Sequence, residues 1–230
     1  MSNLIDIGKK YPTSKNITGF LEIYERYFRD YREKEIKILE IGVDRGDSLR
    51  LWREYFTRAK ICGIDIKNNN IDINGVEIFI GDQSNAKFLK NIINKYQSFD
   101  IIIDDGSHIS KHIIKSIDCL FDHLNKNGLY IIEDLQTSYF PRYGGSRYKL
   151  RKNRTSMNYI KSLTDSINYE HYDRPFFKRK KFDGIIKYIH FYQNIAIIKK
   201  GESVKYFYKD KDKQNNFSDK IKKIISNFYK

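Results

Sequence analysis

Two short acidic stretches contain the residue types that metal-assisted and proton-transfer chemistry require. The stretch DDGSH (Asp104–His108) follows the apolar run 99–103, and the pair Glu133 and Asp134 follows the apolar run 128–132. Four carboxylates gathered in one place repel one another, and a divalent cation relieves that repulsion. Oxygen ligands favour a hard ion such as Mg²⁺. A solvated turn or a helix cap is the plain alternative for either stretch, but two acidic pairs with a histidine favour a metal site.

A third segment, EIGVDRGDS (Glu40–Ser48), has the pattern of a cofactor-binding turn between a strand and a helix. Its two glycines permit a sharp turn and leave room for a ligand at the start of the helix. The dinucleotide fingerprint G-x-G-x-x-G is absent, and Glu40 would repel a pyrophosphate but suits a cationic ligand. Asp65 ends the next predicted strand, where a carboxylate can accept hydrogen bonds from ribose hydroxyls. Asp82 and Gln83 end the strand after it, where an adenine amino group could be bound.

This ordered set of strand-end residues resembles the S-adenosylmethionine site of a class I methyltransferase more than a nicotinamide or flavin site. The candidate cofactor-binding residues in this set are Glu40, Gly42, Gly46, Ser48, Asp65, Asp82 and Gln83.

The elements that position these residues follow from the hydrophobic pattern. Short apolar runs alternate with amphipathic stretches, which predicts strands at 36–42, 60–66, 76–82, 99–105 and 128–134 with helices between most of them. The alternation predicts an α/β fold: a doubly wound, Rossmann-like sheet, mainly parallel, with helices on both faces. Runs 187–192 and 194–200 predict a C-terminal antiparallel hairpin. In such a sheet the strand 99–105 lies between 36–42 and 128–134, so the acidic pairs and the cofactor turn meet at one edge.

The chain is expected to form one methyltransferase-type domain over residues 1–201. This domain has an N-terminal helical segment at 1–35 and an acceptor-binding insertion or lid at 135–186, with one predicted helix at 155–167. Residues 202–230 form a basic tail with a predicted amphipathic helix at 217–229. Within the insertion, Tyr139 and Tyr143 are candidate acceptor-binding residues, although tyrosines that only pack a lid would look the same.

The 230 residues carry a formal net charge of +14, which suits an anionic partner. The lysines are scattered through a chain that is rich in Lys, Ile, Asn and Tyr, so the charge alone is weak evidence for any partner. The sequence shows no N-terminal signal-peptide pattern and no apolar run of membrane-spanning length. Cys62 and Cys119 lie in apolar segments without metal-type spacing, which predicts free thiols and a cytoplasmic location.

Five stretches together resemble the magnesium-dependent sugar O-methyltransferases of the mycinamicin and macrocin type. They are KYPTSK…GFLEIYERYF (10–28), ILEIGVDRGDSLRLW (38–52), IDDGSHI (103–109), IIEDLQTSYF (131–140) and IHFYQNIAIIKKG (189–201). The resemblance covers most of residues 8–201. It implies that Asp105, Glu133 and Asp134 hold the metal, that His108 is the base and that Asp104 faces the cofactor.

The same resemblance implies cofactor contacts from Tyr11 and Thr13 in the N-terminal segment. This chain has Pro12 and Ser14 where the family often has Gly and Asp, which weakens that expectation. The implied reaction transfers a methyl group from S-adenosylmethionine to a sugar hydroxyl. A nucleotide-linked or surface-polysaccharide sugar is the expected acceptor, because the positive charge of the chain suits a phosphorylated group. Mg²⁺ or a similar divalent cation would stabilise the developing alkoxide while the histidine removes the proton.

Three other functions stay open at this stage. A nucleic-acid methyltransferase would suit the charge, but its Asn/Asp-Pro-Pro-Tyr and Pro-Cys motifs are absent. A metal-dependent O-methyltransferase of catechol-like small molecules would use similar chemistry on an aromatic acceptor. A non-catalytic cofactor-binding or peripheral membrane subunit would use the basic helix 217–229 to contact a membrane or a second copy of the chain.

Overall fold

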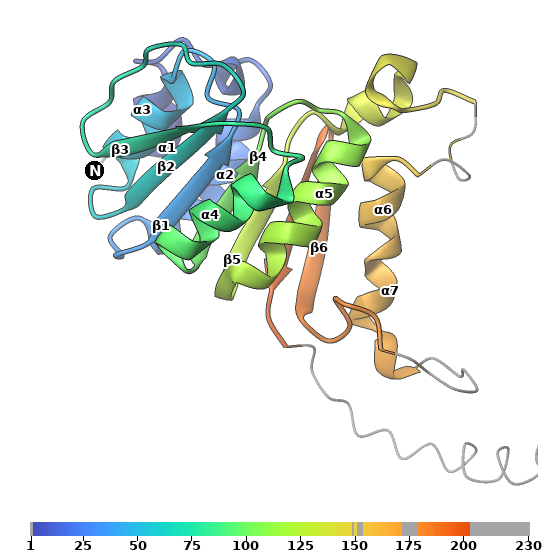
Figure 1. The fold of residues 1–230 in the computed structure, drawn as a ribbon. Coiled ribbons are helices and arrows are strands. Elements are labelled where there is room, and N and C mark those ends of the chain that lie inside the picture. The colour runs from blue at the N-terminus through green and yellow to red at the C-terminus, as the bar shows by residue number, and fades with distance from the viewer. Residues whose placement is uncertain (1, 149, 151–153, 172–178, 203–230) are drawn as a thin grey trace, which may run out of the picture.

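The computed structural model describes residues 2–148, 150, 154–171 and 179–202, which form one seven-stranded sheet with helices on both faces (Figure 1). The strand order is β3-β2-β1-β4-β5-β7-β6. The strands are β1 (Lys37–Ile41), β2 (Lys60–Asp65), β3 (Val76–Ile80), β4 (Phe99–Asp104), β5 (Leu124–Ile132), β6 (Ile186–Tyr192) and β7 (Ile195–Lys200). Strands β1 to β5 are parallel to one another, and β7 is antiparallel to both β5 and β6. The predicted doubly wound sheet with a C-terminal hairpin is therefore confirmed.

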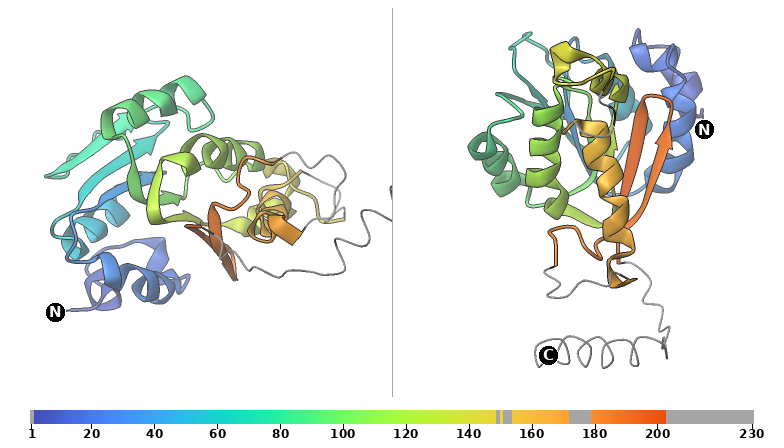
Figure 2. Two further views of the ribbon diagram at one scale, coloured as in Figure 1. Left: turned by 90° about the horizontal axis from the view of Figure 1, so that it is seen from below. Right: turned by 90° about the vertical axis from the view of Figure 1, so that its right-hand side faces the viewer.

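Two layers of helices cover the sheet, and the two faces form separate hydrophobic cores (Figure 2). Helices α1 (Leu4–Gly8), α2 (Phe20–Phe28) and α3 (Asp47–Tyr55) pack on one face. Helices α4 (Ala86–Tyr96), α5 (Ser110–Leu120), α6 (Ser156–Ser162) and α7 (Thr164–Ile167) pack on the other. Alternate residues of each strand point to opposite faces, so Ile38 belongs to the first core and Leu39 to the second. Because the central strands are buried on both faces, nearly all of their residues are apolar.

Two elements differ from the sequence prediction. Strand β5 begins at Leu124 instead of residue 128, after a 3₁₀ turn at Phe121–His123 that ends the preceding helix early. The pairing of β4 with β5 shifts register between Phe99 and Ile101, which accommodates the extra residues as a bulge. The predicted helix 155–167 is two helices, α6 and α7, with Leu163 between them. The predicted tail helix 217–229 lies outside the described residues.

The N-terminal segment and the insertion after β5 are joined to the central sheet in different ways. The N-terminal segment crosses from α1 through a 3₁₀ turn at Ser14–Asn16 to α2 on the first face. The insertion after β5 begins with the 3₁₀ helices η4 (Leu135–Tyr139) and η5 (Pro141–Tyr143) and continues into α6. No helix in the described ranges is both long and apolar enough to cross a membrane.

Candidate active site

The carboxyl ends of β1, β4 and β5 meet at one edge of the sheet. Ile41 of β1 pairs with Asp104 of β4, and Asp104 pairs with Ile132 of β5. The turns that follow these strands are consequently neighbours. Gly42 marks their closest approach, because a Cβ atom at Gly42 would lie 2.1 Å from the Asp105 carbonyl oxygen, and its φ of 91° also favours glycine. This packing fixes the cofactor turn directly against the DDGSH turn.

Two adjoining cavities open at this edge and share Gly42, Asp65 and Gly106 in their walls. The first has a volume of about 360 Å³. Its polar wall includes Thr13, Lys15, Ser48, Asp105, His108 and Asp134. The second has a volume of about 240 Å³. It combines an apolar wall with Asp82, Gln83 and His112. An elongated ligand with one polar and one apolar end fits this pair of cavities.

Asp65 lies at the junction of the two cavities and is held by the backbone. One of its carboxylate oxygens accepts hydrogen bonds from the backbone N–H groups of Val43 and Asp44, each at 2.9 Å, and the other accepts from Lys67 at 2.8 Å. These contacts stiffen the turn after β1. Asp82 is held in a similar way, because the backbone N–H of Ser84 donates to it at 2.7 Å and lowers the pKa of Asp82.

Gln83 connects the second cavity to the DDGSH turn. Its side-chain oxygen accepts a hydrogen bond from the Ser107 backbone N–H at 2.7 Å, and its amide nitrogen donates to Asp104 at 3.0 Å. Asp104 is 1% exposed and lines neither cavity, so it faces the second core, contrary to the expectation that it faces the cofactor. Burial raises the pKa of Asp104 to about 7, although the hydrogen bond from Gln83 opposes this rise.

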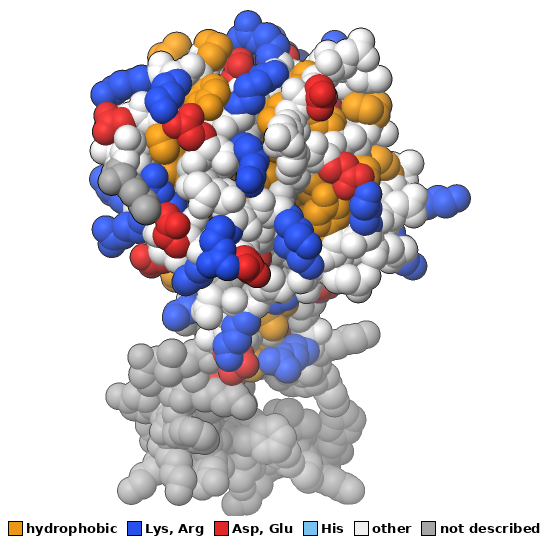
Figure 3. All heavy atoms as spheres, turned by 90° about the vertical axis from the view of Figure 1, so that its left-hand side faces the viewer, with side chains coloured by type: hydrophobic (Ala, Val, Ile, Leu, Met, Phe, Trp, Pro, Cys, Tyr) orange, Lys and Arg blue, Asp and Glu red, His pale blue; other side chains and the backbone are white. Residues whose placement is uncertain are grey.

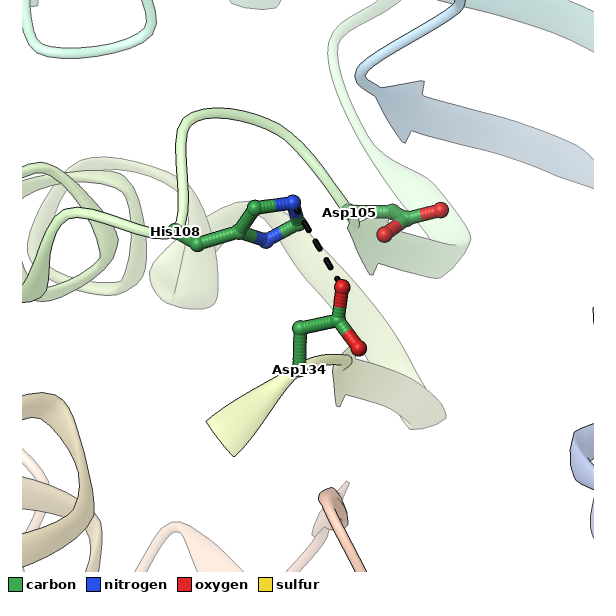
Figure 4. A group of neighbouring side chains, drawn as sticks. All are labelled: Asp105, His108 and Asp134. Atoms are coloured by element: carbon green, nitrogen blue, oxygen red, sulfur yellow. Dashed lines mark ion pairs between the residues drawn. The ribbon is translucent and has the colours of Figure 1, made fainter. Parts of the chain in front are cut away.

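Asp105, His108 and Asp134 form a cluster at the rim of the first cavity (Figure 4). One ligand atom from each of them lies within 4.8 Å of the other two, and His108 Nε2 is 3.5 Å from Asp134 Oδ2. All three side chains are partly exposed. Two carboxylates and one imidazole, open to solvent on one side, fit a hard divalent ion that keeps water or acceptor oxygens in its remaining positions.

The backbone of this cluster is strained and is held by neighbouring side chains. His108 has a φ of 57° and Asp134 a φ of 54°, which are left-handed conformations that cost non-glycine residues about 1–3 kcal/mol. Thr137 Oγ1 lies within hydrogen-bond distance of two carbonyl oxygens, that of Asp134 at 2.7 Å and that of His108 at 3.1 Å, and so links the two backbone segments. Gln136 Nε2 donates to Asp134 Oδ1 at 3.0 Å, which leaves Oδ2 on the side of His108. Strain retained at this point is typical of a functional site.

A buried lysine, Lys15, lies behind the cluster. Its ammonium group is 2.6 Å from Asp105 Oδ2, 2.9 Å from Glu133 Oε1 and 3.6 Å from Glu40 Oε1. Burial alone would lower the pKa of Lys15, but the carboxylates of Glu133, Asp105 and Glu40 together raise it well above its usual value. The Tyr24 hydroxyl also donates to Glu133. Lys15 is therefore a permanent counter-ion for three acidic groups.

This lysine changes the roles of two residues selected from the sequence. Glu40 is fully buried, accepts hydrogen bonds from Ser48 at 2.8 Å and Trp52 at 3.2 Å, and has Lys15 as its cationic neighbour. Burial raises the pKa of Glu40 to about 7, although Lys15 opposes the rise. Glu133 is 2% exposed, and its oxygens face Lys15 and Tyr24 instead of the cluster. Its part in metal binding stays a prediction.

The structure brings most of the selected residues to the two cavities. Thr13, Gly42, Ser48, Asp65, Asp105, His108 and Asp134 line the first cavity, and Asp82 and Gln83 line the second. Tyr11 does not reach either cavity, because its hydroxyl donates to Glu54 at 2.8 Å. Gly46 precedes α3 in a left-handed conformation and serves the turn. The Tyr143 ring lies 6.3 Å from the His108 ring, whereas Tyr139 lies in η4 and lines neither cavity.

Sequence reasoning missed several residues that shape the site. The sequence gives no role to Lys15, His112, Gln136 or Thr137. Lys15 ends the KYPTSK stretch, and Gln136 and Thr137 follow shortly after the Glu-Asp pair, so both stretches drew attention without indicating these residues. Pro12 and Ser14, the two positions that depart from the family pattern, also line the first cavity.

Known proteins with related sequences include sugar O-methyltransferases. A scan against models of known protein families matches none of them to this chain. Mycinamicin VI 2''-O-methyltransferase of Micromonospora griseorubida is 38% identical over 216 residues, which are 87% of this chain and 53% of that protein. Demethylmacrocin O-methyltransferase of Streptomyces fradiae is 35% identical over 210 residues, which are 86% of this chain and 53% of that protein.

The structural comparison agrees with the sequence comparison. The MycE methyltransferase from the mycinamycin biosynthetic pathway, solved in complex with Mg and SAH, matches with a TM-score of 0.84 and 37% identity. The match covers 89% of this chain and 55% of MycE. The chain thus spans about half the length of the relatives that it matches. Over the span that it shares with them, the chain is a homologue of the sugar O-methyltransferases of the mycinamicin and macrocin type.

Proposed function

We propose that the protein transfers a methyl group from S-adenosylmethionine to a sugar hydroxyl with the help of Mg²⁺ or a similar divalent cation. The observation that carries this proposal is the position of the Asp105, His108 and Asp134 cluster on the rim of the first of two adjoining cavities at the carboxyl edge of the sheet. A methyl donor in the cavity and an acceptor at the cluster would be neighbours. Such proximity supplies a large part of the rate enhancement in a two-substrate reaction.

His108 is the proposed base. Its imidazole lies at the rim of the first cavity, and the Asp134 carboxylate at 3.5 Å would stabilise the imidazolium that forms when His108 takes the hydroxyl proton. Thr137 fixes the backbone of His108, and Gln136 fixes the far oxygen of Asp134. These contacts hold the base in one orientation before the acceptor arrives.

Asp105 and Asp134 would hold the cation, with Glu133 as the third ligand implied by the family resemblance. When bound there, the ion would lower the pKa of an acceptor hydroxyl and stabilise negative charge on its oxygen. Lys15 takes one oxygen of Asp105, so the other oxygen stays available at the rim. The single positive charge of Lys15 partly compensates the buried carboxyl groups of Glu40 and Glu133.

The cofactor would occupy both cavities. The second cavity, with Ile41, Ile64 and Ile109 in its wall, suits a purine ring, and Asp65 at the junction suits ribose hydroxyls. The first cavity, next to the N-terminal turn that contains Thr13, suits the charged amino-acid end. Solved relatives with Mg and SAH support the same cofactor pair.

The finer parts of the proposal concern the acceptor and the cellular setting. The acceptor sugar is nucleotide-linked or belongs to a surface polysaccharide, and the enzyme works in the cytoplasm, where the free thiols of Cys62 and Cys119 would stay reduced. On the face shown in Figure 3, basic and acidic side chains are interspersed, which does not favour nucleic acid as a partner of that face.

A methyl-transfer screen tests the proposed function. Purified protein is incubated with radiolabelled S-adenosylmethionine and a panel of nucleotide sugars, free sugars, catechols and RNA, with Mg²⁺ or with chelator. We expect label on a sugar hydroxyl only when Mg²⁺ is present. Labelling of a catechol or of RNA with sugars unlabelled would contradict the proposal.

A further inference from the structure

The segment Tyr139–Arg147 folds back over the DDGSH turn. The backbone N–H of Gly145 donates to the Phe140 carbonyl oxygen and that of Ser146 donates to the Ser138 carbonyl oxygen, each at 3.1 Å. The hydroxyl group of Ser138 lies 2.7 Å from that of Ser156 at the start of α6. A Cβ at Gly144 would lie 4.0 Å from the Cβ of Ser110, the first residue of α5. The loop is therefore closed on itself and rests beside the cluster.

Two arginines on this loop are held by its own aromatic rings. The Arg142 guanidinium lies 4.7 Å from the centre of the Tyr143 ring, and the Arg147 guanidinium lies 5.4 Å from the centre of the Phe140 ring. The Tyr143 ring is in turn 6.3 Å from the His108 ring. Only one side chain thus separates the Arg142 cation from the proposed base. Stacking of this kind restricts a long side chain and leaves its five N–H donors exposed.

Neither arginine has a carboxylate partner among the described residues. Arg142 and Arg147 are both exposed, and no Asp or Glu oxygen of the described ranges lies within ion-pair distance of either guanidinium. Among the described arginines, Arg29, Arg32, Arg45, Arg50 and Arg58 have acidic partners, whereas Arg26, Arg53, Arg154 and Arg179 share with these two the lack of one. The start of α5 also lacks a side-chain cap, so the positive end of its helix dipole adds positive potential near the cluster.

We propose that Arg142 and Arg147 form a subsite for the phosphate groups of an acceptor sugar. The inference rests on the proposed function and specifies its substrate class: a sugar whose anomeric oxygen carries a phosphate or diphosphate. With the reacting hydroxyl at His108, the opposite side of a sugar ring reaches the loop, where two guanidiniums can bind phosphate oxygens in pairs. A nucleotide-linked sugar and a lipid-linked sugar diphosphate share this chemistry.

Binding measurements test the subsite independently of turnover. Calorimetry with S-adenosylhomocysteine present compares a nucleoside diphosphate hexose, the same hexose as a neutral methyl glycoside, a lipid-linked hexose diphosphate with a short lipid, and inorganic pyrophosphate. The variants are Arg142→Gln, Arg147→Gln and the double variant. Arg179→Gln is the matched control, because Arg179 is also exposed and stacks 4.8 Å from a tyrosine ring, that of Tyr169, away from the cluster.

We expect each single variant to weaken binding of the phosphorylated sugars about tenfold, since each loses charge-assisted hydrogen bonds. Binding of the methyl glycoside and of S-adenosylhomocysteine should not change, and Arg179→Gln should behave as wild type. Pyrophosphate should compete with the phosphorylated sugars only. The tighter of the two diphosphate sugars identifies the carrier.

Two results would overturn the subsite. One is equal affinity of the wild-type protein for the neutral glycoside and the phosphorylated sugars. The other is unchanged binding of the phosphorylated sugars in the double variant. Failure of the proposed function is a separate result, because it would appear as loss of methyl transfer to every acceptor while these binding differences persist.

Discussion

The ammonium nitrogen of Lys15 lies 2.6 Å from Asp105 Oδ2, across 90 residues of sequence, and joins the N-terminal segment to the proposed metal site. The same ammonium contacts Glu133 and Glu40. One buried cation therefore compensates acidic residues from three adjacent strand ends. The N-terminal segment is part of the site, since it supplies this cation and one wall of the first cavity.

Replacing Lys15 with Met should destabilise the protein strongly. Removal of one partner from a buried ion pair leaves an uncompensated charge and costs about 3–5 kcal/mol. Urea unfolding of Lys15→Met measures this loss. Lys10→Met is the control, because Lys10 pairs with Glu54 at an exposed position where a lost pair costs at most about 1 kcal/mol. Equal losses for the two variants would show that Lys15 is not the central counter-ion.

Replacing His108 with Ala should reduce the methyl-transfer rate by about 10²–10⁴-fold, the usual contribution of a general base. Affinity for S-adenosylmethionine, measured by calorimetry, should stay near that of wild type. The exposed His171 offers a control, since His171→Ala should leave the rate unchanged. A His108→Ala enzyme with a normal rate would remove this residue from the mechanism.

Replacing Asp134 with Asn should raise the Mg²⁺ concentration needed for half-maximal activity at least about tenfold. The neutral amide is a poorer ligand than the carboxylate, and even indirect partners of metal ligands contribute about 10–100-fold to affinity. Activity titrations with Mg²⁺ after chelator treatment provide the measurement. Asp72→Asn, away from the cluster, should show the wild-type requirement. An unchanged requirement in Asp134→Asn would place the ion elsewhere.

The free energy of unfolding should fall as pH rises from about 4 to about 7, in part because folding raises the pKa of Asp104. Its pKa is about 7 in the folded protein and near the ordinary value of 3.8 when unfolded. Between these values the folded state holds a proton that the unfolded state has lost, so unfolding becomes easier by up to about 1.4 kcal/mol per pH unit.

The variant Asp104→Asn cannot ionise, so its free energy of unfolding should fall less over this pH range than that of wild type. Urea titrations at pH 5 and pH 7.5, with chelator present, compare the two proteins. A parallel pH dependence in both would show that Asp104 is ionised throughout.

The order of the central strands and the meeting of the two acidic stretches followed from the sequence. Parallel strands joined by helices leave little freedom of order, so β4 had to lie between β1 and β5. Which member of each acidic pair reaches the cavity rim did not follow from the sequence, because three of the four residues lie just beyond the strand ends. Asp104 is the last residue of β4 and is buried, whereas Asp105 lies in the turn after it. Glu133 faces Lys15 and Tyr24, whereas Asp134 takes a left-handed backbone conformation and lies beside His108.

The role of Lys15 could not be predicted in the same way. Lysines are almost never fully buried, and a long-range partner carries no local periodicity in the sequence. Only the repulsion expected among the strand-end carboxylates indicated that a cation was needed. The sequence prediction attributed all of the compensating positive charge to a metal ion and a cofactor, whereas Lys15 supplies one positive charge from the chain itself.

Anomalous scattering from Mn²⁺, in crystals grown with S-adenosylhomocysteine, tests the central claim most directly. The account predicts one strong peak bonded to carboxylate oxygens of Asp105 and Asp134 at about 2.0–2.2 Å, beside His108 and facing the cofactor sulfur. Crystals that contain the cofactor product but show no peak between these two carboxylates would contradict it.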